Sequence, residues 1–305
     1  MILSLALGRR DAIAGLTETA RQAERAGVDL LLAGYPRGGL ESGVLPADPA
    51  ALDPLSVASA LIGVTSRIGL AAVVPTAGWA PFNMARAFSA LDNLSAGRAG
   101  WFSIAGEDAD RGRFAEHLQV TFALMESWDL DALIFDKTEA VFTDPAKVHR
   151  VAHAGRYFTV DGPLNSPRSP QGRPFLLQAA GPEAEQADIM VTRPPRLDAA
   201  RGAGRAGQRV IVDLTFSLTG AEIGPDASLA YSGEPAGLAD LMRAWASACD
   251  GFNLLPARPA DVAAFAEHAA PILRGVGLIR ERTGPTLRTR LELTRVAEPA
   301  LAVVS

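Results

Sequence analysis

Acidic and histidine side chains form the two clusters of this sequence whose types suit proton transfer or metal binding. Glu107, Asp108 and Asp110 follow an apolar run, where a carboxylate could serve as a general base, although a solvated acidic loop is the more common role. His149 and His153 stand four residues apart, so we expect them to share one face of a strand. Because two imidazoles without a convincing third ligand do not make a metal site, we predict a structural role for the pair and no bound metal.

Two further motifs suggest chemistry that their surroundings do not support. Residues 202–207 match the glycine pattern of a dinucleotide-binding loop, which needs a strand before it and a helix after it. Here the order is reversed, so we interpret the motif as a loop between a helix and a strand. Cys249 is the single cysteine, which excludes an internal disulfide. It has no recognisable histidine partner nearby, and we predict a small buried helix residue instead of a nucleophile.

Apolar runs of strand length alternate with amphipathic segments of helix length. The predicted strands are 2–7, 28–34, 67–74, 98–105, 175–179, 187–192, 209–217 and 250–255. The predicted helices are 11–27, 54–65, 81–94, 113–129, 196–205, 235–248 and 260–273, with a single turn around 182–187. Such alternation predicts an α/β protein with a parallel sheet. Eight units favour a (β/α)8 TIM barrel over a doubly wound open sheet, which they would overfill.

Two stretches interrupt this rhythm. Alternating residues predict a β-hairpin near 147–161, inserted into the barrel wall. Few residues separate the fifth strand from the sixth, too few for a full-length helix and two loops, so we expect shortened helices after strands 5 and 6. The loop 34–53 is rich in Gly, Pro and Ala and long enough to be mobile or to cover a site. We interpret residues 1–305 as one domain.

Composition and charge narrow the class of protein. The chain is 48% apolar and carries a net charge of −5, and it shows no basic patch with interleaved aromatics. We therefore expect a soluble, cytoplasmic protein that binds neither nucleic acid nor membrane. Five arginines follow Gly277, namely Arg280, Arg282, Arg288, Arg290 and Arg295. They would either form an anion site or pair with acids on their own surface or at a subunit contact.

Long segments along the chain resemble the bacterial luciferase-like flavin-dependent monooxygenases, in particular the nitrilotriacetate and sulfone monooxygenase-like branch. These segments are 52–76, 81–101, 128–137, 144–179 and 250–293. The fourth of these segments, 144–179, reads DPAKVHRVAHAGRYFTVDGPLNSPRSPQGRPFLLQA. The fold of that family is a (β/α)8 barrel, which agrees with the strand count.

The resemblance implies a two-component monooxygenase that acts on a small organic substrate. A separate reductase would supply reduced FMN, and the barrel would bind it at its C-terminal mouth, activate O2 and exclude water. A homodimer is expected on the same ground. The resemblance identifies no catalytic residue, but it places the flavin at Ala33, Gly34, Val73, Trp101, Phe102, Arg113, Gln178, Ala180 and Gly181.

The phosphate cradle of the family, Q-A-G-x-S-x-x-G after the fifth strand, is altered in this sequence. Gln178 is kept, but Ala180 replaces the first Gly and Pro182 replaces the Ser. Pro has neither an N–H nor a hydroxyl to donate, and Glu183 and Glu185 place negative charge near the expected phosphate. A hydrogen bond to a charged group contributes about 1.5–3 kcal/mol, so losing three donors would weaken FMN binding by about three or more powers of ten.

Other flavin positions differ as well. The Asn, Thr and Ser that follow the fourth strand in the family are Phe102, Ala105 and Gly106, and the tyrosine that opens the next helix is Phe114. We therefore predict that FMN binding is weak or lost. Three hypotheses stay open: an active FMN-dependent monooxygenase, a barrel that acts as a non-catalytic binding or auxiliary protein, and an oxidoreductase that uses a deazaflavin.

Overall fold

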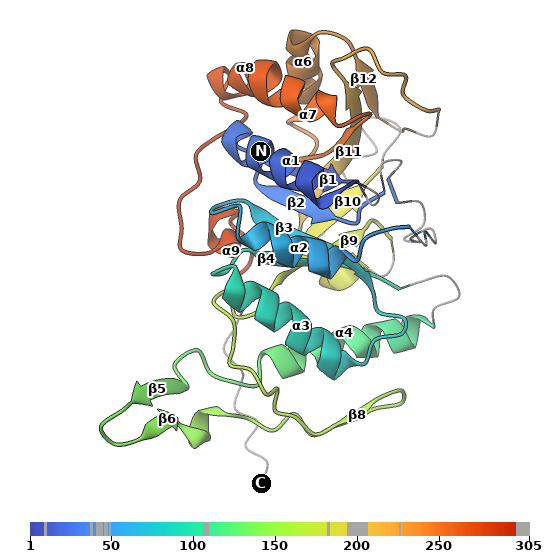
Figure 1. Ribbon diagram of the computed structural model, residues 1–305. Coiled ribbons are helices and arrows are strands. Elements are labelled where there is room, and N and C mark those ends of the chain that lie inside the picture. Colours follow the sequence, from blue (N-terminus) through green and yellow to red (C-terminus); the bar gives the residue numbers. More distant parts are fainter. Residues whose placement is uncertain are drawn as a thin grey trace.

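Eight parallel strands close into a ring at the centre of the computed structural model (Figure 1). In ring order they are β1 (Ile2–Leu7), β2 (Leu30–Ala33), β3 (Gly69–Pro75), β4 (Ala99–Ile104), β9 (Phe175–Ala179), β10 (Ile189–Thr192), β11 (Arg209–Ser217) and β13 (Gly251–Pro256). The last strand pairs with the first. The predicted (β/α)8 barrel is confirmed, and every strand begins and ends within two residues of its predicted bounds.

The structure describes residues 1–296 apart from 9–10, 37–38, 41–44, 46–47, 49, 106–109, 182–183, 194–206, 226 and 228. The helix predicted at 196–205 lies outside these residues, as does the glycine motif apart from Gly207. Within the described ranges, every helix is too short or too polar to cross a membrane.

Helices flank the barrel on its outer side (Figure 1). They are α1 (Ile13–Ala26), α2 (Pro54–Ile62), α3 (Pro81–Leu94), α4 (Arg111–Met125), α6 (Pro235–Trp245), α7 (Ala260–Ala264) and α8 (Ala270–Gly275), with a π-helical turn at Phe265–Ala269 between the last two. Local signals fix several ends. The Asp53 carboxylate accepts the N–H of Ser56 at 2.7 Å and caps α2, while Gly27 ends α1 with a φ of 85°.

Among its described residues, the connection after the fifth strand contains only the 3₁₀ turn η2 (Ala184–Gln186), which confirms the shortened helix expected there. The corresponding helix after β10 falls outside the described residues. The sequence did not predict two short elements. The strand β12 (Ala230–Ser232) pairs with the C-terminal part of β11, and α9 (Leu287–Arg290) lies near the C-terminal end of the described chain.

Two antiparallel hairpins leave the barrel between α4 and β9 (Figure 1). The first, β5 (Leu133–Asp136) and β6 (Val141–Thr143), was not predicted. The second, β7 (His153–Ala154) and β8 (Thr159–Val160), lies within the hairpin predicted at 147–161.

The prediction that this second hairpin enters the barrel wall is wrong. β7 and β8 pair only with each other, and the hairpin packs on α4. The carboxylate of Glu116 accepts the N–H groups of Tyr157 (3.1 Å) and Phe158 (2.9 Å) and contacts His153. Because eight other strands already satisfy one another around the ring, the hairpin finds its partner groups on a helix.

The parity of each strand divides its side chains between two cores, because successive residues point to opposite faces. One core fills the space between strands and helices, and the other fills the inside of the barrel. Leu287 and Leu291 pack into the inner core at the N-terminal end, near α9, while Tyr35 and Leu40 join it from the loop after β2. The barrel interior is therefore a packed core closed at both ends.

Candidate functional site

The C-terminal mouth of the barrel gathers most of the residues predicted to contact a flavin, but it does not turn them all inward. Val73 and Phe102 belong to the inner core. Ala33 and Trp101 belong to the outer core, and Gln178 has the same parity on β9 as its outer-core neighbour Leu176. Only part of the predicted set therefore faces the inside of the barrel.

Trp101 is held tightly on the outer side of the wall. Its indole N–H donates to the carbonyl of Val74 at 3.1 Å. Its ring stacks on Phe88, with centroids 5.4 Å apart, and meets His117 edge to face. With 1% of its surface exposed, this side chain packs strand β4 against α3 and α4 and does not line the interior.

The segment that follows β2 covers the mouth. Gly34 turns the chain with a φ of 84°, and a Cβ there would lie 2.4 Å from Pro54, so this position requires glycine. The next residue, Tyr35, is 1% exposed, and its ring meets Phe102 edge to face at 5.3 Å. Leu40 is buried in the same core. These described residues of loop 34–53 thus close the C-terminal end of the barrel, and the expectation that the loop covers a site stays a prediction.

Beneath this segment lies a buried polar network centred on Asp213. The Tyr35 hydroxyl donates to its carboxylate at 2.9 Å, and the amide of Asn253 donates to the other oxygen at 2.7 Å. Ser4 in turn donates to the Asn253 side-chain oxygen at 2.8 Å. The Nε of Arg193, just after β10, is 3.9 Å from the Asp213 carboxylate. The neighbouring strands β11, β13 and β1 thus supply one layer of polar side chains inside the barrel, namely Asp213, Asn253 and Ser4.

Burial sets the protonation of this network. Asp213 is 2% exposed, and desolvation raises its pKa to about 6, against the opposing effects of Asn253, Tyr35 and Arg193. Burial and the adjacent Asp213 carboxylate raise the pKa of Tyr35 well above its usual value, so the phenol keeps its proton. A carboxyl that titrates near neutrality beside a neutral phenol is suited to exchanging a proton at this end of the barrel.

The sequence prediction included none of Asp213, Asn253 and Tyr35 as site residues. A signal was present, because Asp213 and Asn253 each stand at the centre of an apolar run. A buried ionisable group is costly unless it is paired, so an aspartate in the middle of a buried strand indicates a partner network. In the barrel, Asp213 lies opposite Asn253 on the adjacent strand, and Asn253 lies opposite Ser4. A single apolar run cannot predict which residues of two strands lie opposite each other.

The described residues after β9 do not offer the phosphate cradle of a flavin site. The N–H of Ala180 is bound to the carbonyl of Val191 at 2.7 Å, and the carbonyl of Gly181 accepts the N–H of Ala184 at 3.1 Å. Pro182 lies outside the described residues. Since the Ala180 N–H already belongs to the barrel pairing, it is not a donor for a phosphate.

Two further positions bear on phosphate binding. The guanidinium of Arg113 lies 4.6 Å from the ring centre of Phe158, against the second hairpin, and Phe114 is buried in the outer core. Among the described residues, the buried side-chain oxygens of Gln178 and Ser103 have no hydrogen-bond partner. As they stand, the described groups at Ala180 and Arg113 thus do not fit an FMN phosphate, because both already have other partners.

The remaining candidates have structural roles. Asp110 caps α4 by accepting the N–H groups of Gly112 and Arg113, and it accepts the Tyr157 hydroxyl at 2.6 Å; Glu107 and Asp108 lie outside the described residues. The two histidines bind different acids. His149 lies 2.9 Å from Asp129, and His153 contacts Glu116 as described above. The described part of the chain holds no group of three or more potential metal ligands.

Cys249 follows the end of α6 and is half-buried, so the prediction of a buried helix residue is wrong in both respects. The helix ends at Trp245, before Cys249. Burial raises the pKa of the thiol to about 11, which disfavours the thiolate that a nucleophile requires. The prediction that this cysteine is not a nucleophile agrees with that shift.

Comparison with known proteins places the chain in a family. The family model described as "Luciferase-like monooxygenase" matches residues 3–210. The chain belongs to this family. Dibenzothiophene-sulfone monooxygenase of Rhodococcus erythropolis is 41% identical over 145 residues, which cover 42% of this chain and 32% of that protein. The chain thus spans about a third of the length of this luciferase-like relative.

Other luciferase-like relatives match over more of their length. The N-acetyl-S-(2-succino)cysteine monooxygenase of Bacillus subtilis (strain 168) is 28% identical over 394 aligned positions, which cover 91% of this chain and 89% of that protein. The crystal structure of a long-chain alkane monooxygenase superposes with a TM-score of 0.79 at 21% identity, covering 95% of each chain. At that identity the superposition shows a shared fold.

Proposed function

We propose that this chain is the oxygenating component of a two-component, FMN-dependent monooxygenase that acts on a small organic substrate. The observation that carries the proposal is the family match over residues 3–210. The match covers the barrel strands β1, β2, β3, β4, β9 and β10 and ends at the start of β11. Relatives from the sulfone, nitrilotriacetate and dimethyl-sulfide monooxygenases support it. A separate flavin reductase is the proposed source of reduced FMN.

We place the proposed flavin and substrate site at the C-terminal mouth, where the active sites of (β/α)8 barrels lie. Gly34, Val73 and Phe102 are the predicted contacts that border the inner core there. Ligand entry requires the segment after β2 to move, because Tyr35 packs over Phe102 and Leu40 is buried beside it. Loops that open and close over a site are common in enzymes of this fold.

Weak FMN binding is part of the proposal. The Ala180 N–H is engaged with Val191, and the guanidinium of Arg113 is stacked on Phe158, so two of the predicted phosphate contacts already have other partners. Gly181, which is exposed, is the predicted contact that remains after β9. Because the phosphate does not fit, we derive no reaction step through the flavin.

Within this proposal Asp213 and Tyr35 manage protons at the mouth. When the covering segment moves, the Asp213 carboxyl loses the Tyr35 hydroxyl as a donor and faces whatever enters. A carboxyl with a pKa of about 6 holds or releases a proton near neutral pH, which is the range a general acid or base needs. The Asp213→Asn variant is therefore expected to lose the pH dependence of turnover between pH 5 and 7.

The experiment that tests the function is an oxygen-consumption assay with an added flavin reductase, NADH and FMN, using small organic sulfur compounds as substrates. Substrate-dependent oxygen uptake and an oxygenated product are expected with the full chain. Uptake that does not depend on substrate, together with no product, would favour the alternative of a non-catalytic barrel. A deazaflavin-dependent activity would appear only with that cofactor.

A homodimer, a single domain over residues 1–305 and a cytoplasmic location remain predictions. Size-exclusion chromatography with light scattering measures the first, and limited proteolysis measures the second.

A further inference from the structure

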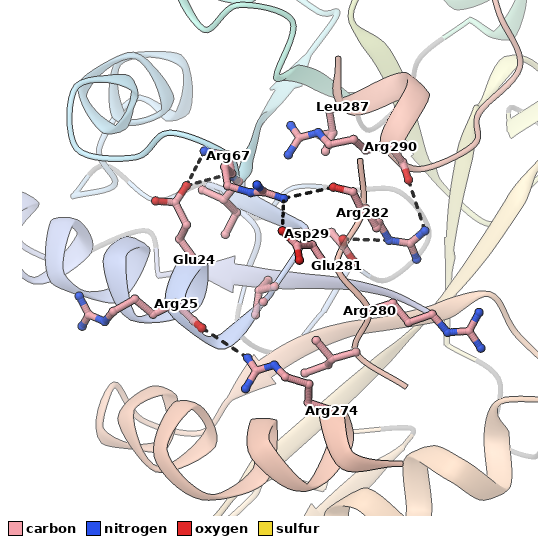
Figure 2. A pocket seen from close by; sticks show the side chains of 14 residues that line it. Glu24, Arg25, Asp29, Arg67, Arg274, Arg280, Glu281, Arg282, Leu287 and Arg290 are labelled. Carbon is pink, nitrogen blue, oxygen red and sulfur yellow. Dashed lines mark hydrogen bonds and ion pairs between the residues drawn. The ribbon is translucent and has the colours of Figure 1, made fainter. Parts of the chain in front are cut away.

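A hollow of about 410 Å³ lies at the N-terminal end of the barrel, opposite the mouth (Figure 2). Residues just before β2 and β3 and the segment around α9 form its walls. Its basic residues are Arg25, Arg67, Arg274, Arg280, Arg282 and Arg290, and its acidic residues are Glu24, Asp29 and Glu281. The hollow is therefore lined by more basic than acidic side chains, although the whole chain has a net charge of −5.

The three acidic side chains of this hollow offset only part of its positive charge. One oxygen of Glu24 accepts the backbone N–H groups of residues 66–68, at 2.6–2.9 Å. Asp29 accepts the Leu3 N–H and pairs with Arg282 at 3.1 Å. Glu281 lies 3.7 Å from Arg67, but its side chain is 80% exposed, and exposed pairs contribute little. The acids therefore leave part of the positive charge uncompensated.

Arg290 carries the clearest unmet binding capacity. Its backbone carbonyl accepts a hydrogen bond from Arg282, but among the described residues its guanidinium has no hydrogen bond or ion pair; Figure 2 draws that group over the hollow without a dashed contact. The group is half-buried, and burial together with the positive charges of Arg67 and Arg98 lowers its pKa. Like charges held together in this way attract an anion.

Arg98 adds fixed charge from the adjoining side. It is 7% exposed, and its guanidinium donates to the carbonyls of Ser95 (2.8 Å) and Ile68 (2.9 Å) and to the Thr65 hydroxyl. Among the described residues, the hydrogen-bond partners of this guanidinium are all neutral oxygens. Arg98 lines a second hollow, of about 380 Å³, which shares Arg67, Arg282 and Arg290 with the first; Arg282 is paired with Asp29. Arg67 and Arg290 thus stand at the junction of two basic hollows.

We propose that this junction binds the phosphate of a nucleotide-sized phosphate monoester, held between Arg67 and Arg290. A guanidinium presents a planar fork of donors that matches phosphate oxygens. A hollow of this size lies within the range of small-molecule sites, and it is larger than a bare phosphate requires. Its apolar lining, Val28, Ile68, Ile279 and Leu287, would contact the organic body of the ligand.

The test is a calorimetric titration of the full chain with AMP, inorganic phosphate and adenosine at low salt. We expect AMP to bind saturably and more tightly than inorganic phosphate, adenosine not to bind, and added salt to weaken the affinity. In the double variant Arg67→Ala with Arg290→Ala, affinity for AMP should fall at least tenfold. Arg290→Lys, which keeps the charge but not the fork, should lose an intermediate amount.

Arg243→Ala is the matched control, because Arg243 pairs with Asp240 on the exposed face of α6, outside both hollows. It should bind AMP like the wild type, and unchanged thermal midpoints would show that the variants fold. Absent AMP binding, or equal binding by the double variant, would overturn the proposal. Equal affinities for AMP and inorganic phosphate would overturn the assignment of an organic body. The proposal does not depend on the chemistry at the mouth, so Asp213→Asn should leave AMP binding unchanged.

Discussion

Replacing Asp213 with asparagine changes the electrostatics of the barrel interior with little change in shape. The asparagine oxygen can still accept the amide of Asn253, and the Tyr35 hydroxyl can turn to accept from the new amide. The negative charge that burial opposes is removed. We therefore expect Asp213→Asn to be more stable than the wild type at neutral pH, and the gain to disappear in acid.

The magnitude follows from the pKa of Asp213. Its value of about 6 in the folded state exceeds the value of 3.8 of the unperturbed group, so the folded protein binds this proton more tightly than the unfolded chain does. Stability therefore falls as the pH rises from 3.8 to 6 and is constant above that range. A shift of about two units corresponds to about 3 kcal/mol in full, of which about 2 kcal/mol falls between pH 4 and pH 7.

The assay is urea unfolding of both proteins at several pH values from 4 to 7. The difference in unfolding free energy between variant and wild type is the quantity of interest, because the titration of other groups cancels in it. Asp240→Asn makes the same chemical change at an exposed position on α6 and serves as the control. A difference that stays constant with pH for Asp213→Asn would refute the account of this network.

Three other perturbations test separate parts of the structure. Gly34→Ala should destabilise the protein by about 1–3 kcal/mol, because φ is 84° and the new Cβ would meet Pro54; Gly15→Ala, with open space around it, should be neutral or stabilising in thermal unfolding. Cys249 should react with a disulfide reagent about 100-fold more slowly than a thiol of unshifted pKa at pH 8, and equal rates would contradict its burial. Glu116→Ala should free the β7–β8 hairpin, seen as several-fold faster proteolysis there, whereas an unchanged rate would mean that other contacts hold it.

The barrel was predictable because its strands are short, apolar and regularly separated. Runs such as 2–7 and 175–179 are buried on both faces, so they stand out without any alternation to interpret. The shortened helix after β9 was equally accessible, because a chain cannot fit a helix into so few residues. The docking of the second hairpin was not predictable, because its partner Glu116 on α4 lies 41 residues before Tyr157 in the sequence.

The site was harder to predict because it depends on the parity of each strand. A shift of one residue moves a side chain from the inner core to the outer core, and this separates Phe102 from its neighbour Trp101. The Asp213 network joins residues up to 249 positions apart, a distance over which local patterns carry no information. The sequence left two roles open for the arginines of the tail. Arg288 pairs with Asp188 at 2.8 Å, as the pairing role expects. The guanidinium of Arg290 has no partner among the described residues, and its role in an anion site stays a proposal.

FMN is itself a phosphate monoester, so the two proposed sites must be measured apart. The double variant Arg67→Ala with Arg290→Ala provides a background in which the hollow at the N-terminal end no longer competes. Binding of FMN that survives in this background belongs to another site. Adding Pro182→Ser to it should strengthen FMN binding by about tenfold, since the serine restores an N–H and a hydroxyl and a recovered donor contributes about 1.5–3 kcal/mol.

The most direct test of the central claim is an anaerobic titration of the Arg67→Ala with Arg290→Ala variant with reduced FMN and, separately, with oxidised FMN, monitored by fluorescence or calorimetry. The account predicts saturable binding with a Kd of about 0.1–1 mM, weaker than micromolar by the loss of phosphate donors. Low-micromolar binding of oxidised FMN would contradict the weak phosphate site. No saturable binding of reduced FMN up to several times that range would contradict the assignment of this luciferase-like barrel as an FMN-dependent monooxygenase.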